Sequence, residues 1–244
     1  MSTVAALILG VTSIVLSQKR EIDAKNEQIS RDVASPLFLE IEEIKDDFLG
    51  NMTTLIDRLF GNFTSIWTGF NKTNEKIIAL DISNEIKNFY LQCNEYCKNL
   101  NAIYSSNVSI IKNELDAMLK SYTEIIVESK RQDFFKMKYL DSYGREHAIN
   151  LSKFLIFNRN PISYLSSCFK DFDINNVSLI IYAKKHDKYI EIEYVGEYYM
   201  NMVDRIEKKF SEVKEIQKLR ENRMKLIKDA ERIMNTLREH IISV

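Results

Sequence analysis

The chain has 244 residues and a formal net charge of −1, from 34 Lys and Arg against 35 Asp and Glu. This balance gives no overall attraction to nucleic acid, so we expect no nucleic-acid partner. Gly (6) and Pro (2) are scarce, and because tight turns need these residues, the composition favours long helices over a many-stranded sheet.

The amino-terminal residues are apolar. No charged residue occurs in residues 1–17, and Lys19 and Arg20 follow closely. A membrane-spanning helix needs about 20 apolar residues, with a range of roughly 17–25, so this segment is at the short limit. We expect residues 1–17 to be a single-pass transmembrane anchor in the cell membrane, with the amino terminus outside and the positively flanked body cytoplasmic. The residues expected to contact the lipid bilayer are Val4, Leu7, Ile8, Leu9, Val11, Ile14, Val15 and Leu16.

Two alternatives to an anchor are a cleaved signal peptide and a buried or interfacial helix. A signal peptide carries Lys or Arg before its apolar stretch, whereas only Ser2 and Thr3 lie between Met1 and the apolar residues here. This difference favours the anchor. A short anchor followed by a helical body is also the layout of small bacterial membrane proteins, which is a likeness of arrangement alone.

Residues 18–35 are expected to form a polar stalk, which ends at Ser35 because the residue before a proline avoids the helical region. Residues 36–140 are expected to form a bundle of long helices. Apolar residues recur there in steps of four, three and four, an 11-residue repeat that keeps an apolar stripe nearly straight along a helix. A helix this long needs a partner, either another helix of this chain or a second copy of it. The stripe comprises Leu37, Ile41, Ile44, Phe48, Met52, Leu55, Leu59, Phe63, Ile66 and Phe70.

Residues 74–137 continue the helical spacing of apolar residues. A turn-like cluster of Ser and Asn occurs at residues 104–107, which predicts a pair of antiparallel helices joined there. A single helix through the cluster is the alternative.

Residues 141–244 are expected to form a helical region that begins with a helix ending near Asn158. It ends in a long amphipathic helix at about 197–241. Residues 177–195 are ambiguous within it. Ile190 and Ile192 alternate with Glu191 and Glu193, which predicts a small β-hairpin, but an apolar stripe continuing into the last helix predicts a helix, which we favour. The expected fold class is therefore all-α: a transmembrane helix followed by an elongated helical bundle or coiled coil, with a possible β-hairpin at 177–195.

No motif for catalysis or for a cofactor occurs in the sequence. The glycine-rich phosphate loops, the zinc-protease motif and the nucleophile elbow are all absent, so we expect no enzyme, no catalytic residue and no cofactor. Cys93 and Cys97 lie one helical turn apart, but a zinc site usually needs four ligands. We interpret them as packed residues on a helix face and expect no metal.

These observations favour a non-enzymatic, membrane-anchored scaffold that self-associates or binds a partner helix. One alternative is an effector that perturbs membranes, for example in antiviral defence, when oligomerisation clusters its anchors. Another is a helical nuclease: the pairs Arg145 and His147, and Arg238 and His240, resemble fragments of the Arg and His pair of HEPN domains. The single residue between each Arg and His is too short a spacing for that motif.

Overall fold

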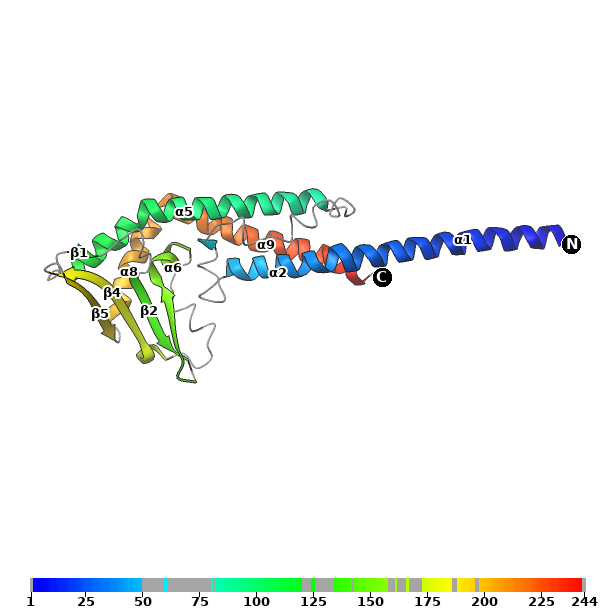
Figure 1. The fold of residues 1–244 in the computed structure, drawn as a ribbon. Coiled ribbons are helices and arrows are strands. Elements are labelled where there is room, and N and C mark those ends of the chain that lie inside the picture. Colours follow the sequence, from blue (N-terminus) through cyan, green and yellow to red (C-terminus); the bar gives the residue numbers. More distant parts are fainter. Residues whose placement is uncertain are drawn as a thin grey trace. The chain divides into compact units, whose positions relative to one another are not determined.

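The computed structural model of the chain is mostly helical and contains one antiparallel β-sheet (Figure 1). The chain divides into two compact units. Unit 1 comprises Met1–Lys45, Thr64–Leu91 and Ile227–Val244, and unit 2 comprises Asp46–Phe63 and Gln92–Leu226. The residues that the structure describes are 2–49, 59–60, 80, 82–119, 124–125, 134–141, 143–157, 161, 166, 173–185, 188–195 and 198–242.

The first helices follow one another through a π-helical turn. Helix α1 spans Ser2–Ile29, the π-helical turn η1 spans Ser30–Ala34, and α2 spans Ser35–Leu49. The Ser35 hydroxyl donates a hydrogen bond to the Ser30 carbonyl at 3.0 Å. Pro36 lies in the first turn of α2, where a missing N–H costs little. The break predicted at Ser35 is therefore a change of helix type.

Within the described part of the chain, no helix has both the length and the hydropathy that a membrane span requires. This finding contradicts the predicted anchor at residues 1–17 and the predicted single-pass placement in the cell membrane. The apolar stretch was already short, and α1 runs on from it into exposed charged residues at Lys19, Arg20 and Glu21. Of the residues expected to contact lipid, Ile14, Val15 and Leu16 are exposed. The side chains of the others lie outside the described residues: Val4, Leu7, Ile8, Leu9 and Val11.

Helix α5 spans Ser83–Leu119 without a break, so the turn predicted at residues 104–107 is wrong. The hydroxyls of Ser105 and Ser106 and the amide of Asn107 each donate to a carbonyl four residues earlier, at 2.9, 3.0 and 2.9 Å. Such bonds satisfy short polar side chains inside a helix. The residues that suggested a turn are thus accommodated by the helix itself.

The sheet belongs to unit 2. Strands β3, β2, β4 and β5 lie in this spatial order, and β1 pairs with β4 on the same side as β2. The strands are β1 (Glu124–Ile125), β2 (Phe135–Leu140), β3 (Glu146–Asn150), β4 (Val177–Lys185) and β5 (Lys188–Val195). A short 3-10 helix, η3 (Ile174–Asn176), precedes β4.

Alternation of apolar and polar residues explains strand β2. Phe135, Met137 and Tyr139 are buried, whereas the lysines between them are partly exposed. Successive side chains of a strand point to opposite faces, so this pattern buries one face only. Met137 lies opposite Leu179 of β4 and Ile149 of β3, and both are buried.

The sheet contradicts the predicted all-α fold class. Residues 177–195 form the hairpin of β4 and β5, with Ile181 opposite Ile192, so the helix favoured there is wrong. Strand β4 carries three consecutive buried residues, Leu179, Ile180 and Ile181, as a strand buried on both faces does. The helix predicted to end near Asn158 is instead β3 followed by the short helix α6.

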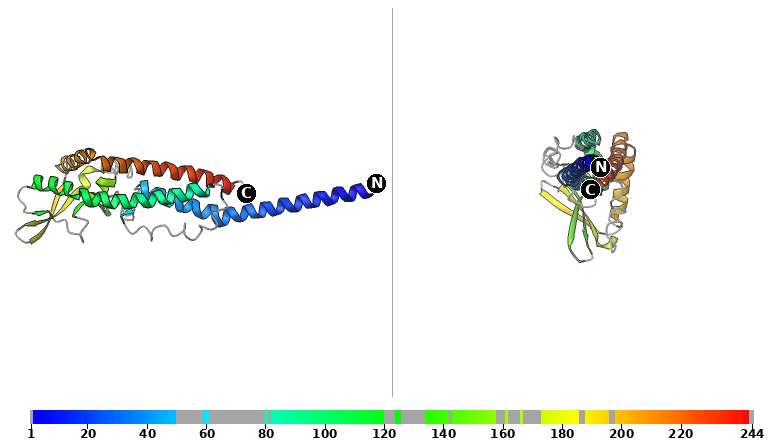
Figure 2. Two further views of the ribbon diagram at one scale, coloured as in Figure 1. Left: turned by 90° about the horizontal axis from the view of Figure 1, so that it is seen from above. Right: turned by 90° about the vertical axis from the view of Figure 1, so that its right-hand side faces the viewer.

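Helices α6 and α8 pack on the sheet. Helix α6 (Leu151–Phe157) is buried throughout and contacts β2 and β3, whereas α8 (Tyr198–Ser211) contacts β5 and α6. The single helix expected at about 197–241 is two helices, because Glu212 and Val213 separate α8 from α9 (Lys214–Ile242). Helix α9 lies beside α5 (Figures 1 and 2).

The continuity of α5 can be tested at Ser106, which is exposed. Ser106→Pro should destabilise the protein by about 3 kcal/mol, because proline removes a hydrogen bond inside a helix and clashes with the preceding turn. Ser106→Ala, the control, should stabilise it by up to about 0.5 kcal/mol, because alanine has the higher helix propensity. Urea unfolding measures both changes, and a tolerated proline would show that α5 is interrupted there.

Candidate functional site

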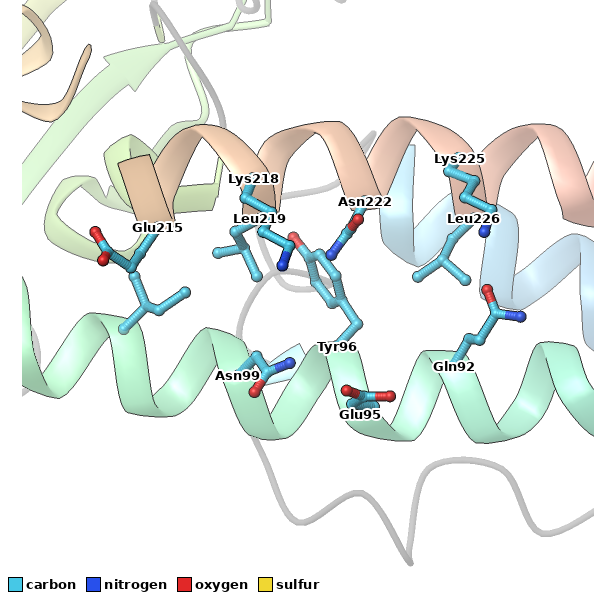
Figure 3. Close-up of a pocket in the computed structure, with 11 residues that line it drawn as sticks. Gln92, Glu95, Tyr96, Asn99, Glu215, Lys218, Leu219, Asn222, Lys225 and Leu226 are labelled. Carbon is cyan, nitrogen blue, oxygen red and sulfur yellow. The ribbon is translucent and has the colours of Figure 1, made fainter. Parts of the chain in front are cut away.

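Helices α5 and α9 border a groove in unit 2 with a volume of about 410 Å³ (Figure 3). Its apolar lining consists of Tyr96, Ile103, Leu219 and Leu226. The polar lining comes from α5 through Gln92, Glu95 and Asn99, and from α9 through Glu215, Lys218, Asn222 and Lys225. The groove thus has an apolar strip flanked by charged and amide side chains on both helices.

Tyr96 occupies the centre of this groove. Its ring reaches from α5 toward α9 and lies between Leu219 and Asn222 (Figure 3). On α2, the Phe48 ring packs edge-on against Tyr96, with 5.0 Å between the ring centroids. The Tyr96 hydroxyl is buried and makes no hydrogen bond within the described residues. Burial raises the pKa of this phenol well above its usual range, so Tyr96 stays neutral.

A buried ion pair lies on the part of α9 that lines the groove. The Arg220 guanidinium contacts both carboxylate oxygens of Glu207 on α8, with Nη1 to Oε1 at 2.7 Å and Nη2 to Oε2 at 2.9 Å. It also donates to the backbone carbonyls of Leu155 and Ile156 in α6. These are carbonyls of the last helical turn, which lack a partner inside the helix. One side chain therefore joins three helices of unit 2.

Further titratable groups are buried around Tyr96. The Arg223 guanidinium lies 4.6 Å from the centroid of the Phe157 ring, within cation–π range. Burial lowers the pKa of Arg223, and the nearby charge of Arg220 lowers it further. Burial, and then the charge of buried Asp47, raises the pKa of the Cys97 thiol to about 12. Since the thiolate is the reactive form of cysteine, Cys97 is an unreactive thiol at neutral pH.

The described part of the predicted stripe lies inside the protein. Leu37, Ile41, Ile44, Phe48 and Leu59 are all buried. Met52, Leu55, Phe63, Ile66 and Phe70 lie outside the described residues. Phe48 packs on Tyr96 of α5 in the same chain, so this member of the stripe contacts another helix of this chain.

The hairpin of β2 and β3 has a turn organised by Asp141. One carboxylate oxygen accepts the backbone N–H groups of Tyr143 and Arg145, both at 2.9 Å. The other accepts Arg145 Nε at 2.8 Å and His147 Nε2 at 3.0 Å. These hydrogen bonds, with His147 first, hold the pKa of Asp141 below its usual range. Gly144 adopts a positive φ of 73°, which favours glycine, in open space.

Arg145 and His147 have a structural role in this turn. Both side chains bind one structural carboxylate, and the His147 ring stacks on Tyr139 with 5.1 Å between the centroids. In unit 1, the Arg238 guanidinium lies over the Phe38 ring. His186 lies outside the described residues. A nuclease site built from these residues stays a prediction, with no geometry to support it.

Across the described residues, no three His, Cys, Asp or Glu side chains lie close enough to hold a metal ion. Cys93 and Cys97 are both buried thiols. Comparison of the chain with models of known protein families, with curated proteins and with solved structures gave no match.

The structure also shows an exposed apolar surface on α1, which includes Ile14, Val15 and Leu16 of the predicted anchor. Every side chain from Ile14 to Gln28 on α1 is exposed. Most exposed large apolar side chains in the described regions belong to unit 1: Ile14, Val15, Leu16, Ile22, Leu39, Leu91 and Ile242. Exposed apolar side chains that gather on one element are typical of an interaction site.

The Arg220 pair offers a test of burial. Removing one partner of a buried pair costs about 3–5 kcal/mol, so Arg220→Met should destabilise the protein by at least about 3 kcal/mol. The matched control is Arg232→Met, because Arg232 binds Glu85 at 2.9 Å with 58% of its side chain exposed, against 6% for Arg220. An exposed pair contributes about 1 kcal/mol or less. Urea unfolding measures both, and equal losses would contradict a buried Arg220.

The Asp141 turn predicts a pH dependence. Because the folded pKa is lowered, Asp141 stabilises the protein fully above the ordinary carboxyl pKa of about 4, and this contribution is lost as the pH falls toward the folded value. Asp141→Asn should therefore lower the melting temperature at pH 7, and the gap to wild type should narrow below about pH 4. Asp204→Asn, an exposed change on α8, should have no effect at pH 7. A gap that stays constant down to pH 2 would refute this account of the turn.

Proposed function

We propose that the chain is a non-enzymatic interaction protein that self-associates through α1 and serves as a scaffold. The observation that carries this proposal is the exposure of residues 14–28 of α1 in the single chain. A helix in a protein is held mainly by packing of its apolar face, and an isolated helix is marginal in water. This part of α1 makes no such packing, so a partner outside the chain would stabilise it.

The sequence of α1 supports association with another helix. Val15, Ile22 and Ile29 are spaced by seven residues, which is the repeat of one of the two apolar positions in a coiled-coil heptad. Val15 and Ile22 are 56% and 59% exposed. Burying an aliphatic side chain of this size contributes about 1.5–3 kcal/mol, so two such residues from each copy supply a substantial driving force.

The absence of catalytic motifs from the sequence supports a scaffold rather than an enzyme. The alternative, an effector that perturbs membranes by clustering its anchors, required a membrane-spanning helix. No helix in the described part of the chain is long and apolar enough to span a membrane, so this alternative is not supported.

Self-association can be tested on α1 directly. Wild-type protein should form oligomers in a concentration-dependent manner in sedimentation velocity, and Val15→Asp/Ile22→Asp should be monomeric because it places charges in the apolar contact. The variant should keep the circular dichroism and melting transition of unit 2, since neither side chain is buried. The control is Tyr143→Asp, which changes an exposed aromatic residue of unit 2 (82% exposed). A wild type that stays monomeric at high concentration would refute the proposal.

A further inference from the structure

We propose that α1 pairs antiparallel with α1 of a second copy of this chain, in a contact centred near Val15. The inference rests on the proposed self-association and gives that contact its face, its direction and its centre. It is drawn from unit 1, where the exposed apolar face of α1 continues the buried face of α2.

A seven-residue repeat of apolar residues runs through both helices. Its members are Val15, Ile22 and Ile29 in α1, and Leu37 and Ile44 in α2. Only the step from Ile29 to Leu37 takes eight residues. Exposure changes along the repeat, because the two α2 residues are buried, Ile29 is half-buried, and Ile22 and Val15 are exposed. The repeat therefore leaves the interior of unit 1 at Ile29.

The π-helical turn η1 keeps this repeat on one face. The backbone N–H of Ser35 donates to the Ser30 carbonyl, five residues earlier, whereas an α-helix bonds residues that are four apart. The turn thus takes one residue more than an α-helical turn, which accommodates the eight-residue step. Pro36 explains the wider turn, because a proline ring clashes with the carbonyl four residues earlier in an α-helix. The exposed face of α1 is therefore in line with the buried face of α2.

The end of α9 determines the direction of pairing. Helix α9 lies beside α2, with the Arg238 guanidinium 5.4 Å from the centroid of the Phe38 ring. Its carboxyl end reaches the junction of α1 and α2 (Figures 1 and 2). A parallel copy packed on the face of α1 would continue past Ile29 into the space that α9 occupies. An antiparallel copy instead places the helices of the two bodies at opposite ends of the contact.

The free length of α1 determines the centre of the contact. Helix α1 begins at Ser2, and its side chains are exposed from Ile14 to Gln28. An antiparallel copy covers this face without overlapping α9 when its Ser2 lies level with Gln28. The two-fold axis then passes near residue 15, midway between these two positions, and Val15 meets Val15 of the second copy.

The charges of α1 favour the same direction. With the axis near residue 15, the charged stretch at residues 19–27 lies opposite residues 3–11, which carry no charge. In a parallel pair in register, Lys19 would instead face Lys19 of the second copy, because it lies three residues before Ile22 and hence on the same side of the helix. Like charges placed together weaken an interface.

Disulfide trapping tests the direction. Val15→Cys lies at the axis and should give a linked dimer under mild oxidation. Ile22→Cys is the matched variant, because residue 22 lies about 10.5 Å from the axis, so its two copies are about 21 Å apart in the antiparallel pair and adjacent in a parallel one. A disulfide requires Cα atoms within about 7 Å, so Ile22→Cys should give no more linked dimer than wild type. Wild type under the same oxidation controls for the natural cysteines.

Each variant is oxidised at a concentration at which it associates in sedimentation velocity under reducing conditions. A linked dimer of Ile22→Cys as abundant as that of Val15→Cys would overturn the antiparallel pair and leave self-association through α1 standing. A Val15→Cys protein that associates but does not become linked would overturn it as well. A wild type that stays monomeric would defeat the proposed function and this inference together.

Discussion

The guanidinium of Arg220 is the interaction on which unit 2 depends. It binds the carboxylate of Glu207 on α8 and the last carbonyls of α6, while its own helix is α9. A buried charge is tolerated only when its hydrogen bonds are satisfied, so the three helices have to meet at this point. Because α6 and α8 pack on the sheet, Arg220 also fixes the start of α9, and with it one wall of the groove.

The titratable interior and the exposed helix have different roles. Around Tyr96, burial keeps a phenol and a thiol neutral at physiological pH, which suits a rigid interior rather than proton transfer. The α1 side chains between Ile14 and Gln28 are solvated instead. Tyr96 belongs to this buried cluster and also lines the groove, so the groove lies directly against the rigid interior.

Local periodicity predicted some of this structure and misled elsewhere. Leu37, Ile41 and Ile44, which follow the 4-3-4 spacing, are buried. Two periods compete at 189–195, where the strand alternation of Ile190 and Ile192 coexists with a helical stripe, and pairing with β4 decides between them. In β2, Phe135, Met137 and Tyr139 alternate with lysines, which is the spacing of a strand. The groove and the Arg220 network depend on tertiary packing, which single-sequence periodicity does not contain.

At Gly144, the backbone conformation and not contact with neighbouring residues restricts the residue type. Its positive φ of 73° completes the turn around Asp141, yet a Cβ built there would meet no atom within 4 Å. Space therefore places no limit on the side chain at this position. The restriction comes from the handedness of the α-carbon, because L-residues rarely adopt this conformation. A mirror-image amino acid would fit the hairpin where its natural counterpart strains it, so chirality rather than volume selects glycine here.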